Sequence, residues 1–63
     1  MDAVIQVLHE QGPKREDELA RKLGSGRTPE DVAGELRRNK EQGLIELDVD
    51  GYWGLTAAGA ALF

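Results

Sequence analysis

The sequence predicts a mainly α-helical fold with one small β-hairpin and a short C-terminal helix. Apolar residues recur at helical spacing in three stretches between residues 2 and 42, and residue types that begin and end helices bound each stretch. Residues 43–56 instead carry two strand-like runs on either side of Asp50-Gly51, a pair that favours a tight turn. These patterns predict three helices, a hairpin and a last helix, in that order.

The chain has 63 residues, and we expect a single domain over 1–63, whether complete or excised from a longer protein. A chain this short buries only about 60% of the surface that its unfolded form exposes, so its stability margin is small. It has no cysteine, which excludes disulfides and thiolate metal sites. No signal peptide and no run near the ~20 apolar residues of a membrane span is evident, so we expect a cytoplasmic protein that does not enter a membrane.

The first helix is predicted over about residues 2–11. Asp2 can serve as its N-cap, and Gly12-Pro13 supplies the residue pair that commonly ends helices. Its apolar residues at helical spacing are Val4, Ile5, Val7 and Leu8.

The second helix is predicted over about residues 16–23, and Gly24 ends it. Acidic residues 16–18 in its first turn and basic residues 21–22 in its last turn suit the helix dipole. The preceding Lys14 and Arg15 could reach a phosphate, but we interpret them first as the polar residues that lead into this helix.

The third helix is predicted over about residues 29–42 and has the strongest local signal in the chain. Thr28 can serve as its N-cap, Pro29 suits the first helical position, and Asp31 resembles the acidic half of a capping box. Val32 and Leu36 lie one turn apart and are expected to face the core.

The hairpin is predicted to have an odd-length loop, because this choice keeps its apolar side chains together. Two residue pairs follow from a three-residue loop at 50–52, Val49 with Trp53 and Leu47 with Leu55. The side chains then gathered on one face are Ile45, Leu47, Val49, Trp53 and Leu55. Thr56 can cap a last helix over 57–63, whose Leu62 and Phe63 can cover the first helix.

The sequence shows no constellation for catalysis, and we predict a protein that is not an enzyme and holds no metal or cofactor. His9 is the one histidine and is interpreted as a surface residue, and Ser25 is the one serine. The run DVDG at 48–51 resembles part of a calcium loop but lacks the distal ligands that such a loop needs, so we interpret it as a turn.

The charge is distributed unevenly along the chain. The net charge is −4, yet residues 14–40 hold all eight basic side chains against six acidic ones. Residues 41–63 hold four acidic side chains and no basic one. Any attraction to phosphate must therefore come from the middle of the chain.

This order of elements resembles a winged helix-turn-helix domain of the bacterial or archaeal regulator type, over nearly the whole chain. Three segments carry the resemblance: DELARKLG at 17–24, TPEDVAGELRRNKEQGLIE at 28–46 and DGYWGLTAAG at 50–59. In this family the helix after the turn enters the DNA major groove, and the hairpin, or wing, contacts the backbone. The resemblance thus implies binding of double-stranded DNA through the third helix, in transcription regulation or another DNA process.

Carried onto this sequence, the resemblance implies a DNA-binding set made of Arg27, Thr28, Arg37, Arg38 and Lys40. The basic cluster 37–40 is equally explained as a solvated face that complements the helix C-terminus. Several positions depart from the family pattern. The outward positions Pro29, Ala33 and Gly34 offer no side-chain donors, and the wing is acidic. Asn39 stands where the family usually has Leu or Ile, so it must either hydrogen-bond a nearby backbone group or be partly wet.

These departures keep a second function open, that of a protein–protein interaction module whose acidic wing does not bind DNA. Its partner would meet the hairpin at Tyr52 or Trp53, because aromatic side chains anchor interfaces. Of the two, Tyr52 is the better candidate for exposure, since Trp53 can fill the core between the hairpin and the third helix. Regulators of this family often dimerise through extra helices, which this chain lacks, so we expect a monomer in isolation.

Overall fold

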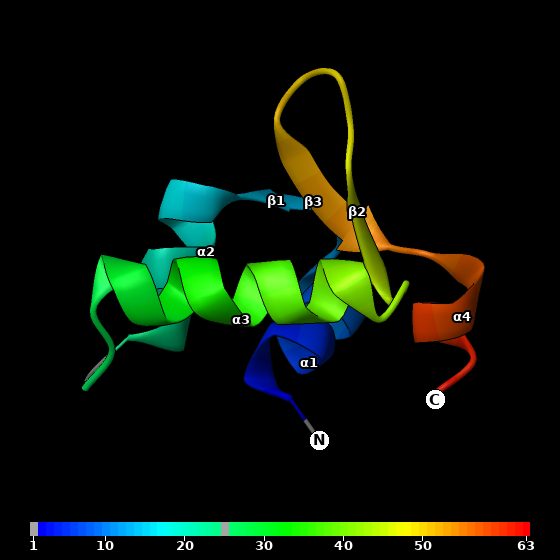
Figure 1. Ribbon diagram of the computed structural model, residues 1–63, viewed down its shortest axis with the longest axis horizontal. Coiled ribbons are helices and arrows are strands. Elements are labelled where there is room, and N and C mark those ends of the chain that lie inside the picture. Colours follow the sequence, from blue (N-terminus) through cyan, green and yellow to red (C-terminus); the bar gives the residue numbers. More distant parts are fainter. Residues whose placement is uncertain (1, 25) are drawn as a thin grey trace.

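The computed structural model describes residues 2–24 and 26–63. Within them, four helices and three strands follow in the order α1 (Ala3–Gln11), β1 (Lys14–Arg15), α2 (Glu16–Leu23), α3 (Pro29–Glu41), β2 (Ile45–Leu47), β3 (Tyr52–Leu55) and α4 (Ala57–Ala60). Figure 1 shows α3 crossing the molecule, with the β2–β3 hairpin rising beside it and α4 at the C-terminal end. The predicted mainly helical fold with a small hairpin is confirmed. None of the described helices has the length and apolarity that a bilayer crossing requires.

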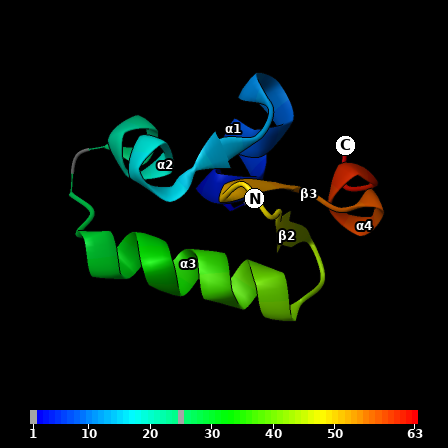
Figure 2. The same cartoon turned by 90° about the horizontal axis from the view of Figure 1, so that it is seen from above.

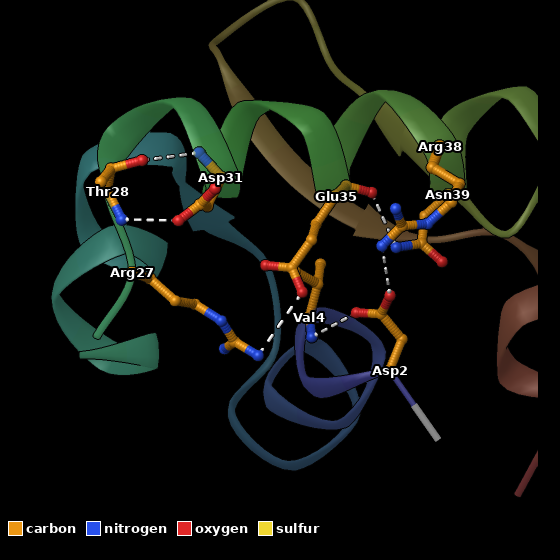
Figure 3. Close-up of polar contacts among 8 residues, drawn as sticks. All are labelled: Asp2, Val4, Arg27, Thr28, Asp31, Glu35, Arg38 and Asn39. Atoms are coloured by element: carbon orange, nitrogen blue, oxygen red, sulfur yellow. Dashed lines mark hydrogen bonds and ion pairs between the residues drawn. The ribbon is translucent and has the colours of Figure 1, made fainter. Parts of the chain in front are cut away.

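The helix starts match the local signals in the sequence. The Asp2 carboxylate accepts a hydrogen bond from the backbone N–H of Val4 at 2.9 Å and so caps α1. At α3 the backbone N–H of Asp31 donates to Thr28 Oγ1 at 3.1 Å, and the backbone N–H of Thr28 donates to the Asp31 carboxylate at 3.0 Å. This reciprocal pair is the predicted capping box (Figure 3), and it fixes where α3 begins.

The core forms where the first three helices meet the sheet. In Figure 2, α3 runs along one side of the molecule, and α1 and α2 lie along the other. The buried apolar side chains between them are Val4, Ile5, Leu8, Leu19, Val32, Leu36, Ile45 and Trp53. Trp53 is 8% exposed, so its predicted place in the core is confirmed.

The sheet has a third strand that the sequence pattern did not predict. The two residues of β1 pair antiparallel with β3, which lies in the middle of the order β1-β3-β2. Lys14 is opposite Trp53, and Arg15 is opposite Tyr52. Two residues are too few to show an alternating pattern, so only the distant partner strand reveals that this segment is extended.

The predicted register of the hairpin is wrong by two residues. The structure pairs Leu47 with Trp53 and Ile45 with Leu55, in place of Val49 with Trp53 and Leu47 with Leu55. Because side chains alternate with a period of two, this shift leaves Ile45, Leu47 and Trp53 on the predicted face. Val49 is instead carried out of the ladder.

The turn explains the shift, because it begins earlier than expected. The Asp48 carboxylate accepts hydrogen bonds from the backbone N–H groups of Asp50 and Tyr52, each at 2.9 Å. The Asp48 carboxylate thus accepts the Tyr52 N–H in place of a backbone carbonyl of the opposite strand, and the turn starts at residue 48. Val49 is therefore fully exposed at the tip, and Leu47 is 46% exposed, so neither adds to the core as predicted.

A network around Thr56 joins the end of α3 to β2 and α4. The Thr56 hydroxyl donates to the Gly43 carbonyl at 2.6 Å and accepts from the backbone N–H of Gly59 at 3.1 Å. Its own N–H donates to the Leu44 carbonyl at 3.0 Å. Thr56 therefore caps α4 as predicted and also holds it against the segment that follows α3.

The last helix is shorter than the predicted 57–63, because α4 ends at Ala60. The Phe63 ring stacks on His9 of α1, with ring centroids 3.7 Å apart and planes 3° from parallel. Leu62 and Phe63 remain about half exposed, so they do not cover α1 as predicted. His9 is exposed, in agreement with its interpretation as a surface residue.

Asn39 takes the first of its two predicted arrangements. It is 3% exposed, and its Nδ2 donates to the Glu35 carbonyl at 2.8 Å, one turn back on the same helix. This bond offsets part of the cost of burying an amide in the core. It also places Asn39 on the same inward stripe of α3 as Val32 and Leu36.

The contact between α4 and the Leu44 carbonyl predicts that replacing Gly59 and Gly34 by alanine has opposite effects on the free energy of unfolding. A methyl group at Gly59 would overlap the backbone carbonyl oxygen of Leu44, so Gly59→Ala should lower the free energy of unfolding by about 1–3 kcal/mol. Gly34 is exposed within α3 and has open space where the added methyl group would lie. Gly34→Ala should therefore raise the free energy of unfolding by about 0.5–1 kcal/mol. Urea denaturation measures both, and equal effects of the two changes would contradict this packing.

Candidate nucleic-acid interface

A shallow groove runs between α3 and the sheet, on the flank of α3 that faces the hairpin. Its volume is about 250 Å³, and its lining residues are Glu16, Ala33, Leu36, Arg37, Lys40 and Trp53. Arg37 and Lys40 are exposed and lie three positions apart, so their side chains are neighbours on the helix surface. The groove thus joins an apolar floor to two cationic side chains from α3 and one acidic side chain, Glu16, from the first turn of α2.

The strand β1 brings a third cation to the same face. Lys14 is paired directly with Trp53, and directly paired residues of an antiparallel ladder point to the same side of the sheet. We call Lys14, Arg37 and Lys40 the groove cations. Across residues 2–24 and 26–63, the ion pairs present involve other basic residues, so the groove cations hold their charge unneutralised by a direct partner.

Two other predicted site residues are engaged at the start of α3. Arg27 forms an ion pair with Glu35, with 3.5 Å between Arg27 Nη2 and Glu35 Oε1 (Figure 3). The Glu35 side chain is only 16% exposed, and its other oxygen, Oε2, is buried with no hydrogen-bond partner in the described residues. Removing Arg27 would therefore leave a poorly solvated carboxylate without a counterion. The Thr28 hydroxyl is likewise used in the capping box.

Arg38 points away from the groove cations, although it adjoins Arg37 in sequence. Successive residues of an α-helix are turned by about 100°, so the two side chains lie on different flanks. Arg38 Nη2 lies 3.5 Å from the Asp2 carboxylate and ties α3 to the first turn of α1 (Figure 3). Of the five predicted residues, the structure thus brings Arg37 and Lys40 together and places Arg27, Thr28 and Arg38 elsewhere.

Solved structures with the same arrangement include a bacterial protein and a human domain. Quinone-bound YodB from B. subtilis is 29% identical, with a TM-score of 0.83 over 94% of this chain and 64% of that one. The Zbeta domain of human DAI, which binds B- and Z-DNA, is 32% identical, with a TM-score of 0.70 over 82% of this chain and 75% of that one. The chain belongs to the winged helix-turn-helix family. No protein-family model matches the sequence, and no curated protein matches it.

In this winged helix chain, α2 and α3 form the helix-turn-helix and the β2–β3 hairpin is the wing. The chain spans about two thirds of the YodB chain, 64% of its length. The groove cations therefore lie between the helix that follows the turn and the wing. The sequence suggests that Lys14 could reach a phosphate, but its place beside the groove follows only from the pairing of β1 with the wing, which was not predicted. The one local signal is the preceding Pro13, which has a fixed extended φ and cannot donate to a ladder.

The outer face of the wing carries a different set of side chains. The Arg15 guanidinium carbon lies 4.7 Å from the centroid of the Tyr52 ring, and side-chain hydrogen bonding to Tyr52 is the main cause that raises the pKa of Arg15. Both residues alternate with Lys14 and Trp53, so they lie on the opposite face of the sheet. Tyr52 is half-buried and Trp53 is buried, so the exposed apolar side chains of the wing are Leu47 and Val49, the latter between two aspartates.

The pairing of Arg27 with Glu35 predicts that Arg27 contributes to stability. Arg27→Ala should lower the free energy of unfolding by about 1 kcal/mol, because it leaves the Glu35 carboxylate without its cation in a partly buried place. Arg37 is exposed and forms no ion pair in the described residues. Arg37→Ala should therefore change the free energy of unfolding by less than about 0.5 kcal/mol. Urea denaturation of the two variants tests this, and a larger loss from Arg37→Ala would refute the assignment.

Proposed function

We propose that this winged helix domain binds double-stranded DNA, with the groove cations in contact with phosphate groups, in transcription regulation or another DNA process. The observation that carries the proposal is that Arg37 and Lys40 of α3 line one groove beside the wing, with Lys14 of β1 on the same face of the sheet as the groove residue Trp53. The Zbeta domain of human DAI binds B- and Z-DNA and resembles this chain, which supports the proposal. The cytoplasmic location predicted from the sequence is part of the same proposal.

Electrostatics decide how strong such binding can be. Neutralising phosphates releases condensed counterions, and this term supplies most of the affinity of a protein that contacts the DNA backbone. Three cations give a small term, and the net charge of −4 opposes the approach of a polyanion. We therefore expect dissociation constants in the range of about 10⁻⁴–10⁻⁶ M that is typical of non-specific binding, tightening as salt is lowered.

The acidic wing restricts the orientation in which a duplex can approach the domain. Glu46, Asp48 and Asp50 are exposed on the wing, whereas the groove cations lie on the flank between α3 and the sheet. Like charges repel, so the tip and outer edge of the wing are held away from phosphate while the groove faces it. In this arrangement the wing limits the possible orientations of the duplex but does not grip its backbone.

The proposal predicts a strong effect of removing two groove cations together. Arg37→Ala with Lys40→Ala should weaken binding to a generic duplex at least about tenfold at low salt, because two of three phosphate contacts are lost. The slope of log K against log salt concentration should become shallower by about 2. Fluorescence anisotropy with a labelled duplex, measured over a series of salt concentrations, gives both quantities.

A matched control separates the site from the overall charge. Arg21→Ala with Lys22→Ala removes the same charge from the last turn of α2, where both side chains are exposed. This variant should keep nearly all of the affinity and the salt slope. Equal weakening by the two double variants would mean that only the net charge matters, and it would overturn the assigned site.

A further inference from the structure

We infer that the domain recognises duplex DNA by its backbone alone, without a preference for base sequence; this inference rests on the proposed function. Reading a base sequence needs side-chain donors or acceptors that reach the base edges in a groove. In helix-turn-helix docking, the N-terminal residues of the helix after the turn make those contacts. The side chains at the N-terminal end of α3 therefore decide whether the domain can recognise a base sequence.

The N-terminal half of α3 lacks free groups for base recognition. Pro29, Ala33 and Gly34 have no side-chain hydrogen-bonding group. Thr28 and Asp31 do have such groups, but the Thr28 hydroxyl and one Asp31 carboxylate oxygen each accept a hydrogen bond in the capping box, at 3.1 and 3.0 Å, which holds both side chains at the start of the helix. Apart from Glu30, then, this surface offers shape, apolar contact and two polar side chains whose positions the capping box already fixes.

Glu30 is the remaining polar side chain on this exposed surface of α3. A carboxylate can accept a hydrogen bond from the cytosine amino group. It also repels the phosphates that flank every base pair, and none of the ion pairs in the described residues involves it. Glu30 thus lowers the affinity for any duplex more than it favours a particular one.

The two arginines that flank this surface are held by acids of the same chain. Arg27 pairs with Glu35 and Arg38 pairs with Asp2, each at 3.5 Å. Arginine reads guanine through two donors of its guanidinium, and each of these arginines already has one guanidinium nitrogen in an ion pair, which competes with a two-donor contact to a base. For Arg27 this would strand the Glu35 carboxylate, whose second oxygen is already without a partner in the described residues.

The groove cations are placed for phosphates and not for bases. Arg37 and Lys40 lie in the C-terminal half of α3, beside the sheet, and Lys14 lies on the sheet itself. Phosphate contacts position a protein on the duplex but carry no sequence information directly. Three such contacts correspond to a slope of about −2.7 in log K against log salt, the same for every sequence.

Selection from a pool of duplexes with a randomised centre tests this inference with the wild-type protein. Bound duplexes are recovered at low salt, amplified over several rounds and sequenced, and the recovered pool is compared with the starting pool by anisotropy. We expect no enriched motif, no gain in affinity over the starting pool, and a salt slope near −2.7 for both. Glu30→Ala should bind the starting pool somewhat more tightly, because it removes a repelling carboxylate.

Each outcome has a separate meaning. A motif bound at least about tenfold more tightly than the starting pool would overturn the inference and leave the proposed function standing. Loss of that preference in Glu30→Ala would identify Glu30 as the group that reads it. An absence of binding to any duplex at low salt would overturn the proposed function itself, and the inference with it.

Discussion

The burial of one stripe of α3 determines most of what this small fold presents to its surroundings. Val32, Leu36 and Asn39 point into the core, and the capping box fixes the residue at which the helix begins. Together they set the rotation of α3 about its own axis. Every other side chain of the helix then has a fixed flank, so packing in the core decides which charges face the groove and which face α1.

The two flanks of α3 differ in how their charges are balanced. On the α1 side, Arg27 and Arg38 meet Glu35 and Asp2, and these pairs hold the helix against the rest of the fold. On the sheet side, the groove cations have no ion pair in the described residues, and their charge remains available to a ligand. In a chain with a net charge of −4, this separation leaves three basic side chains without an ion pair in the described residues near one groove, with the acidic Glu16 beside them. The same helix therefore stabilises the fold with one flank and, in our proposal, contacts phosphate with the other.

Local signals in the sequence predicted the helices well, because caps and periodicity are properties of neighbouring residues. The capping box of Thr28 and Asp31 and the N-cap of Asp2 formed as expected. The strand β1 and the hairpin register were missed, because one depends on partners 37 and 39 positions away and the other on the Asp48 side chain in the turn. For the candidate site, the structure brings Arg37 and Lys40 together on the groove, and their role in DNA binding stays a prediction of the resemblance. The ion pair of Arg38 with Asp2 and the place of Lys14 follow only from tertiary structure.

The most direct test of this account is a titration of amide chemical shifts by NMR with a generic DNA duplex at low salt, followed by a rise in salt. The account predicts that the shifts concentrate at Lys14, Arg37, Lys40 and the Trp53 indole, and that they fade as salt increases, while residues 48–51 at the wing tip change little. Shifts centred on the wing tip or on the α1–α4 face would contradict the assignment of the groove as the binding surface. No shifts at low salt would contradict DNA binding by this domain.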